Sequence, residues 1–109
     1  MGVYELLMKS IDERDAQHYI EALPDDYEFV RHQTGMTMGK SKMSEMMASM
    51  MANGDVVIRD PRCIYENDEI LVEHSVMDFP DGTTEAVMAV HTKKDGKIIR
   101  TETGATLIQ

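Results

Sequence analysis

The chain has 109 residues, a formal net charge of -9 and a single cysteine, Cys63, which fits one cytoplasmic domain over residues 1–109 without an internal disulfide. The charge, with lysines and arginines scattered along the sequence, disfavours nucleic acid and anionic lipid as partners. The segment Val3–Lys9 has neither the basic start nor the long apolar run of a signal peptide, so we expect no secretion and no membrane insertion.

Two short helices are predicted at the start of the chain. Apolar residues at every fourth position predict the first helix over residues 3–11. Asp15 can cap a second helix, which Pro24 ends. Each helix therefore has one apolar stripe that can face a core.

A strand and a third helix follow. The β-forming run Tyr27–His32 predicts a strand, and Gly35–Gly39 predicts a loop. Methionines at helical spacing predict a helix over residues 40–51, with Asn53-Gly54 as its left-handed cap. These methionines are Met43, Met46, Met47, Met50 and Met51.

The remainder of the chain alternates with period two. Four long strands are predicted, over residues 55–66, 69–79, 83–93 and 97–108. The dipeptides that separate them, Asn67-Asp68, Asp81-Gly82 and Asp95-Gly96, are typical of tight turns. Three helices followed by such a meander indicate an α+β domain, in which the helices pack against one face of an antiparallel sheet.

The turn lengths predict which residues share a face of the sheet. If both Asp-Gly dipeptides are two-residue loops, Met77 pairs with Ala86 and Met88 with Thr103. The face beneath the helices then carries Leu71, Met77, Phe79, Ala86, Met88, Val90, Ile99, Ala105 and Leu107. The outer face carries Val72, His74, Val76, Val87, Ala89, His91, Arg100 and Glu102. The aliphatic centre of the outer face predicts a homodimer contact.

Three short motifs stand at element boundaries: Leu23-Pro24-Asp25-Asp26 before Tyr27-Glu28-Phe29, the helix start Gly39-Lys40, and Asp95-Gly96-Lys97-Ile98. With these motifs, the order of elements resembles the SnoaL-like and ketosteroid-isomerase-like families of the nuclear transport factor 2 superfamily. The resemblance implies a cone-shaped fold, a pocket between the concave sheet and the helices, and a homodimer through the opposite face. Because this fold hosts enzymes and binding domains alike, function must come from the site.

The resemblance also locates two departures from the isomerase pattern. The isomerase relatives have a catalytic carboxylate near the end of the first strand, where this chain has Arg31 and His32. Their second acid lies on the penultimate strand, where the nearest counterpart here is Met88. We therefore expect a binding or accessory domain for a small hydrophobic molecule. The alternative is an isomerase, cyclase or dehydratase that needs no cofactor and works by proton transfer.

Glu73 is the strongest candidate for a functional residue. The predicted register places it on the apolar face, opposite Val90 and near Thr101. A partly buried carboxyl group there is a candidate general acid or base, which Ser75 or Thr101 would orient.

A structural ion pair is the competing interpretation of Glu73. If Asn67-Asp68 closes a two-residue hairpin, Arg62 pairs with Glu73 on the same face. Pro61 complicates this register, because proline often marks a bulge, and a slip of one residue would turn Arg62 outward.

His32 is the second candidate acid or base, since the resemblance places it at the pocket mouth. The sequence favours the alternative, an exposed or hydrogen-bonded histidine at a loop edge. Tyr27 would add a phenol to the ligand contacts, or simply belong to the core. The other predicted ligand contacts are Arg62, Ser75, Met88, Val90 and Thr101.

No metal or cofactor is expected. His74 and His91 are predicted to lie diagonally on the outer face, but two histidines without a third ligand do not form a zinc site. Cys63 is also predicted for the outer face, with a structural role.

Overall fold

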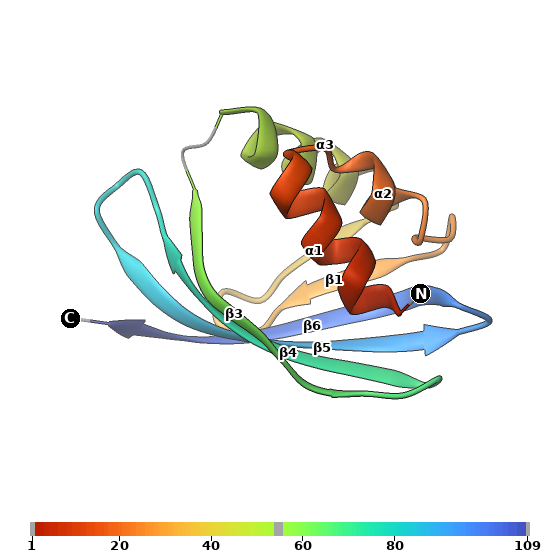
Figure 1. The fold of residues 1–109 in the computed structure, drawn as a ribbon. Coiled ribbons are helices and arrows are strands. Elements are labelled where there is room, and N and C mark those ends of the chain that lie inside the picture. Colours follow the sequence, from red (N-terminus) through yellow and green to blue (C-terminus); the bar gives the residue numbers. More distant parts are fainter. Residues whose placement is uncertain (1, 54–55, 109) are drawn as a thin grey trace.

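The computed structural model describes residues 2–53 and 56–108 (Figure 1). The helices are α1 (Val3–Glu13), α2 (Gln17–Ile20) and α3 (Lys40–Asn53). The strands are β1 (Glu28–Arg31), β2 (Met36–Gly39), β3 (Val57–Glu66), β4 (Ile70–Asp78), β5 (Thr84–Lys94) and β6 (Lys97–Ile108). They form one sheet in the order β2-β1-β6-β5-β4-β3, in which β1 and β6 run parallel and every other neighbouring pair is antiparallel.

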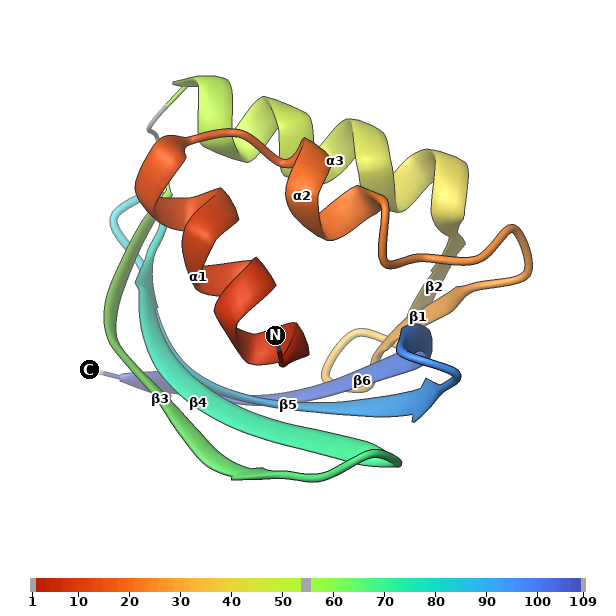
Figure 2. The same cartoon turned by 45° about the vertical axis from the view of Figure 1, so that its right-hand side comes forward.

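The sheet curves around the helices, which cover its concave face (Figure 2). The core lies between the two layers. Its fully buried members include Tyr19, Leu23, Leu71 and Ile98, and burying side chains of this size supplies the main stabilisation of such a domain. The predicted α+β class, with three N-terminal helices on the concave face, is confirmed. No helix in the described part of the chain is long and apolar enough to cross a membrane.

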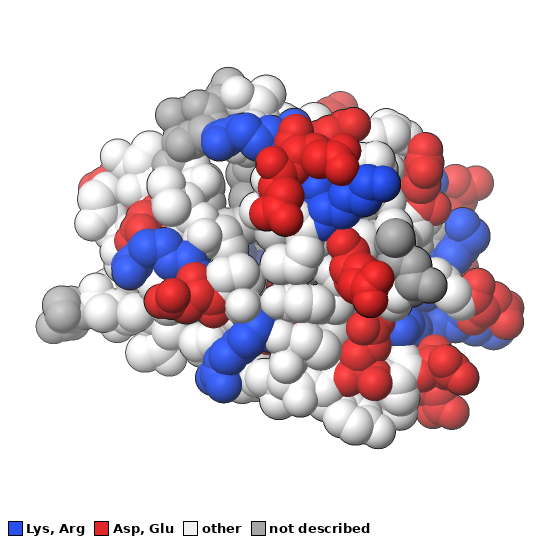
Figure 3. All heavy atoms as spheres, in the orientation of Figure 1, with Lys and Arg blue, Asp and Glu red and all other residues white. Residues whose placement is uncertain are grey.

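The charged surface agrees with the sequence. On the face drawn in Figure 3, lysine and arginine side chains stand among acidic and uncharged ones and do not gather into a patch.

Most predicted elements are found, with one exception in the first half of the chain. The predicted loop over residues 35–39 is wrong, because Met36–Gly39 forms β2 and pairs with β1. Gly35, with φ 75°, lets the chain turn back after β1. The predicted helix cap includes Gly54, which lies outside the described residues.

The predicted register between β4 and β5 is wrong by one residue. The Phe79 amide donates to the Thr83 carbonyl at 2.9 Å, so the loop contains three residues and includes Pro80. Gly82, with φ 88°, takes the left-handed position that such loops require. Met77 therefore pairs with Glu85 and not with Ala86. As a result, every side chain of β5 lies on the face opposite to the predicted one.

A bulge between β5 and β6 lets part of β6 keep the inner and outer faces that the sequence predicts. Asp95-Gly96 is a two-residue loop, as predicted, because Lys94 pairs with Lys97. The register then shifts next to Lys93, and Ile98, not Ile99, is fully buried. Thr101 keeps its inward position but pairs with His91.

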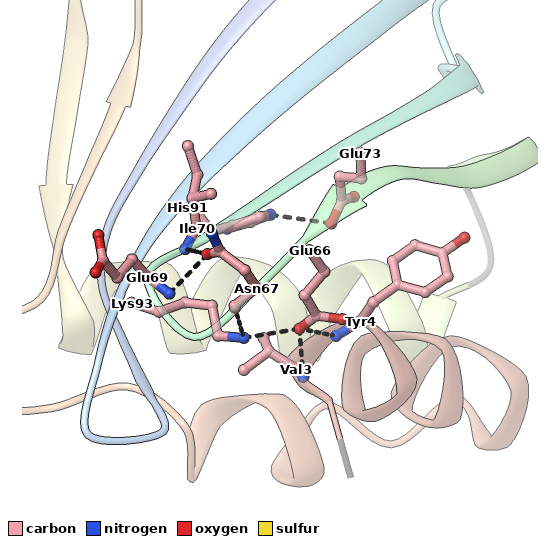
Figure 4. A network of polar contacts seen from close by, with 9 residues as sticks. All are labelled: Val3, Tyr4, Glu66, Asn67, Glu69, Ile70, Glu73, His91 and Lys93. Carbon is pink, nitrogen blue, oxygen red and sulfur yellow. Dashed lines mark hydrogen bonds and ion pairs between the residues drawn. The ribbon is translucent and has the colours of Figure 1, made fainter.

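Helix α1 is held to the sheet by Glu66, near the end of β3. One carboxylate oxygen of Glu66 accepts hydrogen bonds from the Val3 amide at 2.9 Å and from Lys93 Nζ at 2.9 Å (Figure 4). Burial raises the pKa of Glu66, but Lys93 and the amides of Val3 and Tyr4 together bring this pKa below its ordinary value. A carboxylate at the N-terminus of a helix is also stabilised by the helix dipole, so the position of α1 over the concave face is fixed.

Candidate functional site

A cavity of about 190 Å³ lies between the concave face and the helices. Five methionines form much of its helical wall, and they are Met8, Met43, Met46, Met47 and Met50. Strands β4, β5 and β6 form its floor, through Glu73, Ser75, Val87, Ala89, His91, Thr101 and Thr103. The wall is therefore soft and apolar, while the floor carries the polar groups.

Glu73 and His91 form a buried pair on this floor. They project from β4 and β5, and His91 Nε2 lies 2.9 Å from Glu73 Oε2. The His91 side chain is 4% exposed and that of Glu73 is 15% exposed. Figure 4 shows the imidazole pointing at the carboxylate. A carboxylate and an imidazole are the side chains that most often transfer protons in enzymes, and here both face one cavity.

The other side of His91 is held by hydroxyl groups. His91 Nδ1 lies 2.8 Å from Thr101 Oγ1 and 3.4 Å from the Tyr19 hydroxyl. Burial raises the pKa of Tyr19 well above its ordinary value, so the phenol keeps its proton and acts as a donor. Because hydroxyl donors face Nδ1, we assign the imidazole proton to Nε2, from which it is donated to Glu73.

The position of Tyr19 depends on α1. Ser10 is fully buried, and its hydroxyl oxygen accepts a hydrogen bond from the Tyr19 amide at 3.0 Å. This contact begins the short helix α2 and orients the tyrosine toward the sheet. The ring of Tyr19 meets that of His91 edge to face, with centroids 6.3 Å apart.

Glu73 keeps one oxygen for another partner. Its Oε2 is bonded to His91, whereas no described side chain or amide donates to Oε1. A carboxylate oxygen accepts two hydrogen bonds readily. The pair can therefore accept a hydrogen bond from a ligand in the cavity, or take a proton from it, while His91 holds the carboxylate in place.

A second ion pair lies beside this cavity. Arg31, from β1, donates through Nη2 to both oxygens of Glu85 on β5, at 3.1 and 3.3 Å. Their side chains are 26% and 16% exposed, and Arg31 lines the cavity.

The SnoaL-like domain model matches residues 4–101, which is most of the chain. The chain belongs to the SnoaL-like family. No curated protein matches this SnoaL-like domain.

Solved structures show the same fold at low sequence identity. An NTF2-like protein of unknown function from Mesorhizobium loti aligns with a TM-score of 0.77 and 10% identity, over 95% of this chain and 90% of that one. Another, from Cytophaga hutchinsonii, gives 0.74 and 11%, over 97% and 91%. IdmH from Streptomyces antibioticus, a proposed polyketide cyclase, gives 0.69 and 13%, over 94% and 88%. The predicted family resemblance is confirmed.

Three of the predicted site residues of this SnoaL-like domain line the cavity. Glu73, Ser75 and Thr101 lie together on its floor, and Thr101 bonds to the partner of Glu73. Met88 and Val90 do not, because the three-residue loop turns them to the outer face, where Met88 is 45% exposed. Their predicted positions are wrong.

His32 and Tyr27 lie outside the cavity lining. His32 directly follows β1, and its side chain lies on the side of the sheet opposite to that of Arg31. Its Nε2 lies 3.0 Å from Glu102 Oε1 in an exposed contact. Its predicted place at the pocket mouth is therefore wrong. Tyr27 is buried in the core, and burial raises its pKa to about 12, with Thr101 acting in the opposite direction.

The predicted ion pair of Arg62 with Glu73 is also wrong. A register shift between Arg59 and Arg62, around Pro61, makes Arg62 the partner of His74 and leaves it exposed. Cys63 becomes the partner of Glu73 and thus shares the inner side of the sheet, contrary to the prediction, although it remains exposed at the edge strand.

His91, Tyr19 and the pair of Arg31 with Glu85 were missed as site residues. The predicted diagonal of His74 and His91 is wrong, because the two lie on opposite faces. In the described ranges, 2–53 and 56–108, no cluster of His, Cys, Asp and Glu could hold a metal ion. The signal that could have revealed His91 is Pro80, which precedes Asp81-Gly82 and lengthens the loop.

Proposed function

We propose that this SnoaL-like domain binds a small, mainly apolar molecule in the cavity, as a binding or accessory protein. The observation that carries the proposal is the combination of an apolar methionine wall with one largely buried carboxylate, Glu73, which lines the cavity and whose Oε1 has no partner among the described residues. Ligand sites commonly combine apolar walls with a few placed polar groups.

The methionine wall suits a ligand of irregular shape. Methionine has three rotatable side-chain bonds and a polarisable sulfur, so the wall can adapt to different outlines. The ligand would place its apolar body against this wall and a hydrogen-bond donor, or an acidic C–H group, against Glu73.

Filling the cavity is expected to abolish binding. Ala89 lies on the floor and is 8% exposed, so the larger side chain of Ala89→Phe would occupy the space of the ligand. Calorimetry with acetophenone as the probe should show binding for the wild type and none for this variant.

Thr92→Phe is the matched control, because Thr92 lies on the opposite face of the same strand and does not line the cavity. It should bind acetophenone as the wild type does. Equal binding by the Ala89→Phe variant would contradict the proposed site, since a ligand elsewhere on the protein would not sense this change.

A second candidate function is proton transfer without a cofactor, by an isomerase, cyclase or dehydratase. The buried pair of Glu73 and His91 favours proton transfer. IdmH, which has the same fold, is a proposed polyketide cyclase. Glu73 would remove a proton from the substrate and become a carboxylic acid. The proton would later return to another atom of the substrate, while His91 orients the carboxyl group throughout.

We also propose a homodimer through the outer face of the sheet. The corrected register gathers Ala86, Met88 and Val90 on this face. Since Met88 is 45% exposed in the single chain, contact with a second copy would bury it. Sedimentation at micromolar concentration should show a dimer for the wild type and a monomer for Met88→Glu. A monomeric wild type would contradict this proposal.

A further inference from the structure

The ion pair of Arg31 with Glu85 suggests which ligands the cavity selects. We propose that Arg31 is a specificity-determining residue that binds an uncharged oxygen acceptor of the ligand, such as a carbonyl oxygen, while Glu85 disfavours anionic ligands. This inference rests on the proposed binding function and adds the chemical class of the ligand.

The hydrogen bonds of Arg31 leave donors for a ligand. A guanidinium has five N–H groups. Nη2 serves Glu85, and the Gln33 amide, in the orientation that satisfies both its oxygen and its nitrogen, accepts from Nη1 at 3.2 Å. Nε has no partner among the described residues. A half-buried guanidinium beside an apolar cavity gains from an additional acceptor, because burial limits the access of water to its unpaired donors.

The sheet register places Arg31 and Glu73 in one row across the floor. Arg31 pairs with Thr103, Thr103 with Ala89, and Ala89 with Glu73. Three strand spacings separate the two ends of the row, which is roughly 14 Å between backbones. Because the sheet is concave, both side chains reach into the cavity between these ends. One small molecule can then touch Arg31 on one side and Glu73 on the other.

The charges of the site favour an uncharged ligand oxygen over a carboxylate. Glu85 already neutralises Arg31. Glu73 also lines the cavity, and no described arginine or lysine pairs with it. A carboxylate ligand would add a second negative charge in a partly dry space, which is unfavourable, whereas a carbonyl oxygen accepts from Arg31 without this repulsion.

Three probes of nearly equal shape test this proposal: acetophenone, ethylbenzene and benzoate. They present a carbonyl, a methylene and a carboxylate at the same place. Affinities would be measured by calorimetry for the wild type and for Arg31→Met, which keeps an unbranched apolar stem and removes the donors of the guanidinium. A second variant, Arg31→Met with Glu85→Met, avoids a buried unpaired carboxylate and should fold even if the single variant does not.

Arg59→Met is the matched control, because Arg59 forms a similar pair with Asp78 but does not line the cavity. Removing Arg31 should weaken acetophenone binding about tenfold, as expected for a hydrogen bond to a charged group. The affinity of the Arg31 variants for ethylbenzene should stay within about twofold of the wild-type value. The Arg59→Met control should bind all three probes as the wild type does. The wild type should bind benzoate more weakly than acetophenone.

The outcomes separate this inference from the proposed function. Unchanged acetophenone affinity in both Arg31 variants, or benzoate binding as tight as that of acetophenone, would overturn the inference while leaving the binding function in place. A wild-type protein that binds neither ethylbenzene nor acetophenone would overturn the proposed function together with the inference.

Discussion

Glu73→Gln is expected to stop proton exchange in a bound ketone while leaving the protein folded. If Glu73 is a general base, the wild type should exchange methyl protons of acetophenone for deuterium in D₂O. The amide of the variant cannot accept a proton at neutral pH, so the rate should fall by about 10²- to 10⁴-fold. Mass spectrometry of the recovered ketone measures this rate directly.

The fold should survive because glutamine has the size of glutamate, and its oxygen can still accept the hydrogen bond from His91 Nε2. Glu69→Gln is the matched control, since Glu69 lies in the exposed turn between β3 and β4 and should leave the exchange rate unchanged. Marked unfolding of the Glu73 variant would instead support a structural role for the pair. Absence of exchange in the wild type would contradict proton transfer, but not binding.

Removing one member of the buried pair is expected to destabilise the protein more than removing both. His91→Leu takes away the donor that compensates Glu73 Oε2. Since both side chains are largely buried, the loss should be about 3 kcal/mol of unfolding free energy. Replacing both residues by leucine fills the same volume with apolar groups and should return the stability to within about 1 to 2 kcal/mol of the wild type.

Urea unfolding of the three proteins gives these free energies. A polar pair kept in a core for its chemistry contributes little net stability compared with well-packed apolar residues. A double variant that is less stable than His91→Leu would show that the pair is retained for stability, and would weaken the case for a functional site.

The arrangement of elements could be predicted because each signal is local. The stripe of α1, the methionine spacing of α3 and the turns before β4, β5 and β6 each depend on a few neighbouring residues. Glu73 was placed correctly for the same reason, because alternation from Leu71 fixes its face within β4 alone.

The partners of Glu73 could not be predicted, because they depend on how strands are joined. One additional loop residue, Pro80, moves His91 from the outer face to the cavity and moves Met88 the other way. The bulge near Pro61, where Asp60 has φ 51°, turns Arg62 outward. A single-residue shift in register reverses a whole strand, so small errors in loops become large errors in a site.

We propose the cavity beneath the methionine wall as the ligand site of this protein. The methionines themselves report on it, since ¹³C-methyl labelling gives each one an NMR signal. Titration with acetophenone should shift the methyl signals of Met43, Met47 and Met50, which line the cavity, and leave those of the exposed Met36 and Met88 in place. Shifts confined to Met36 or Met88, with the cavity methionines unchanged, would contradict the claim.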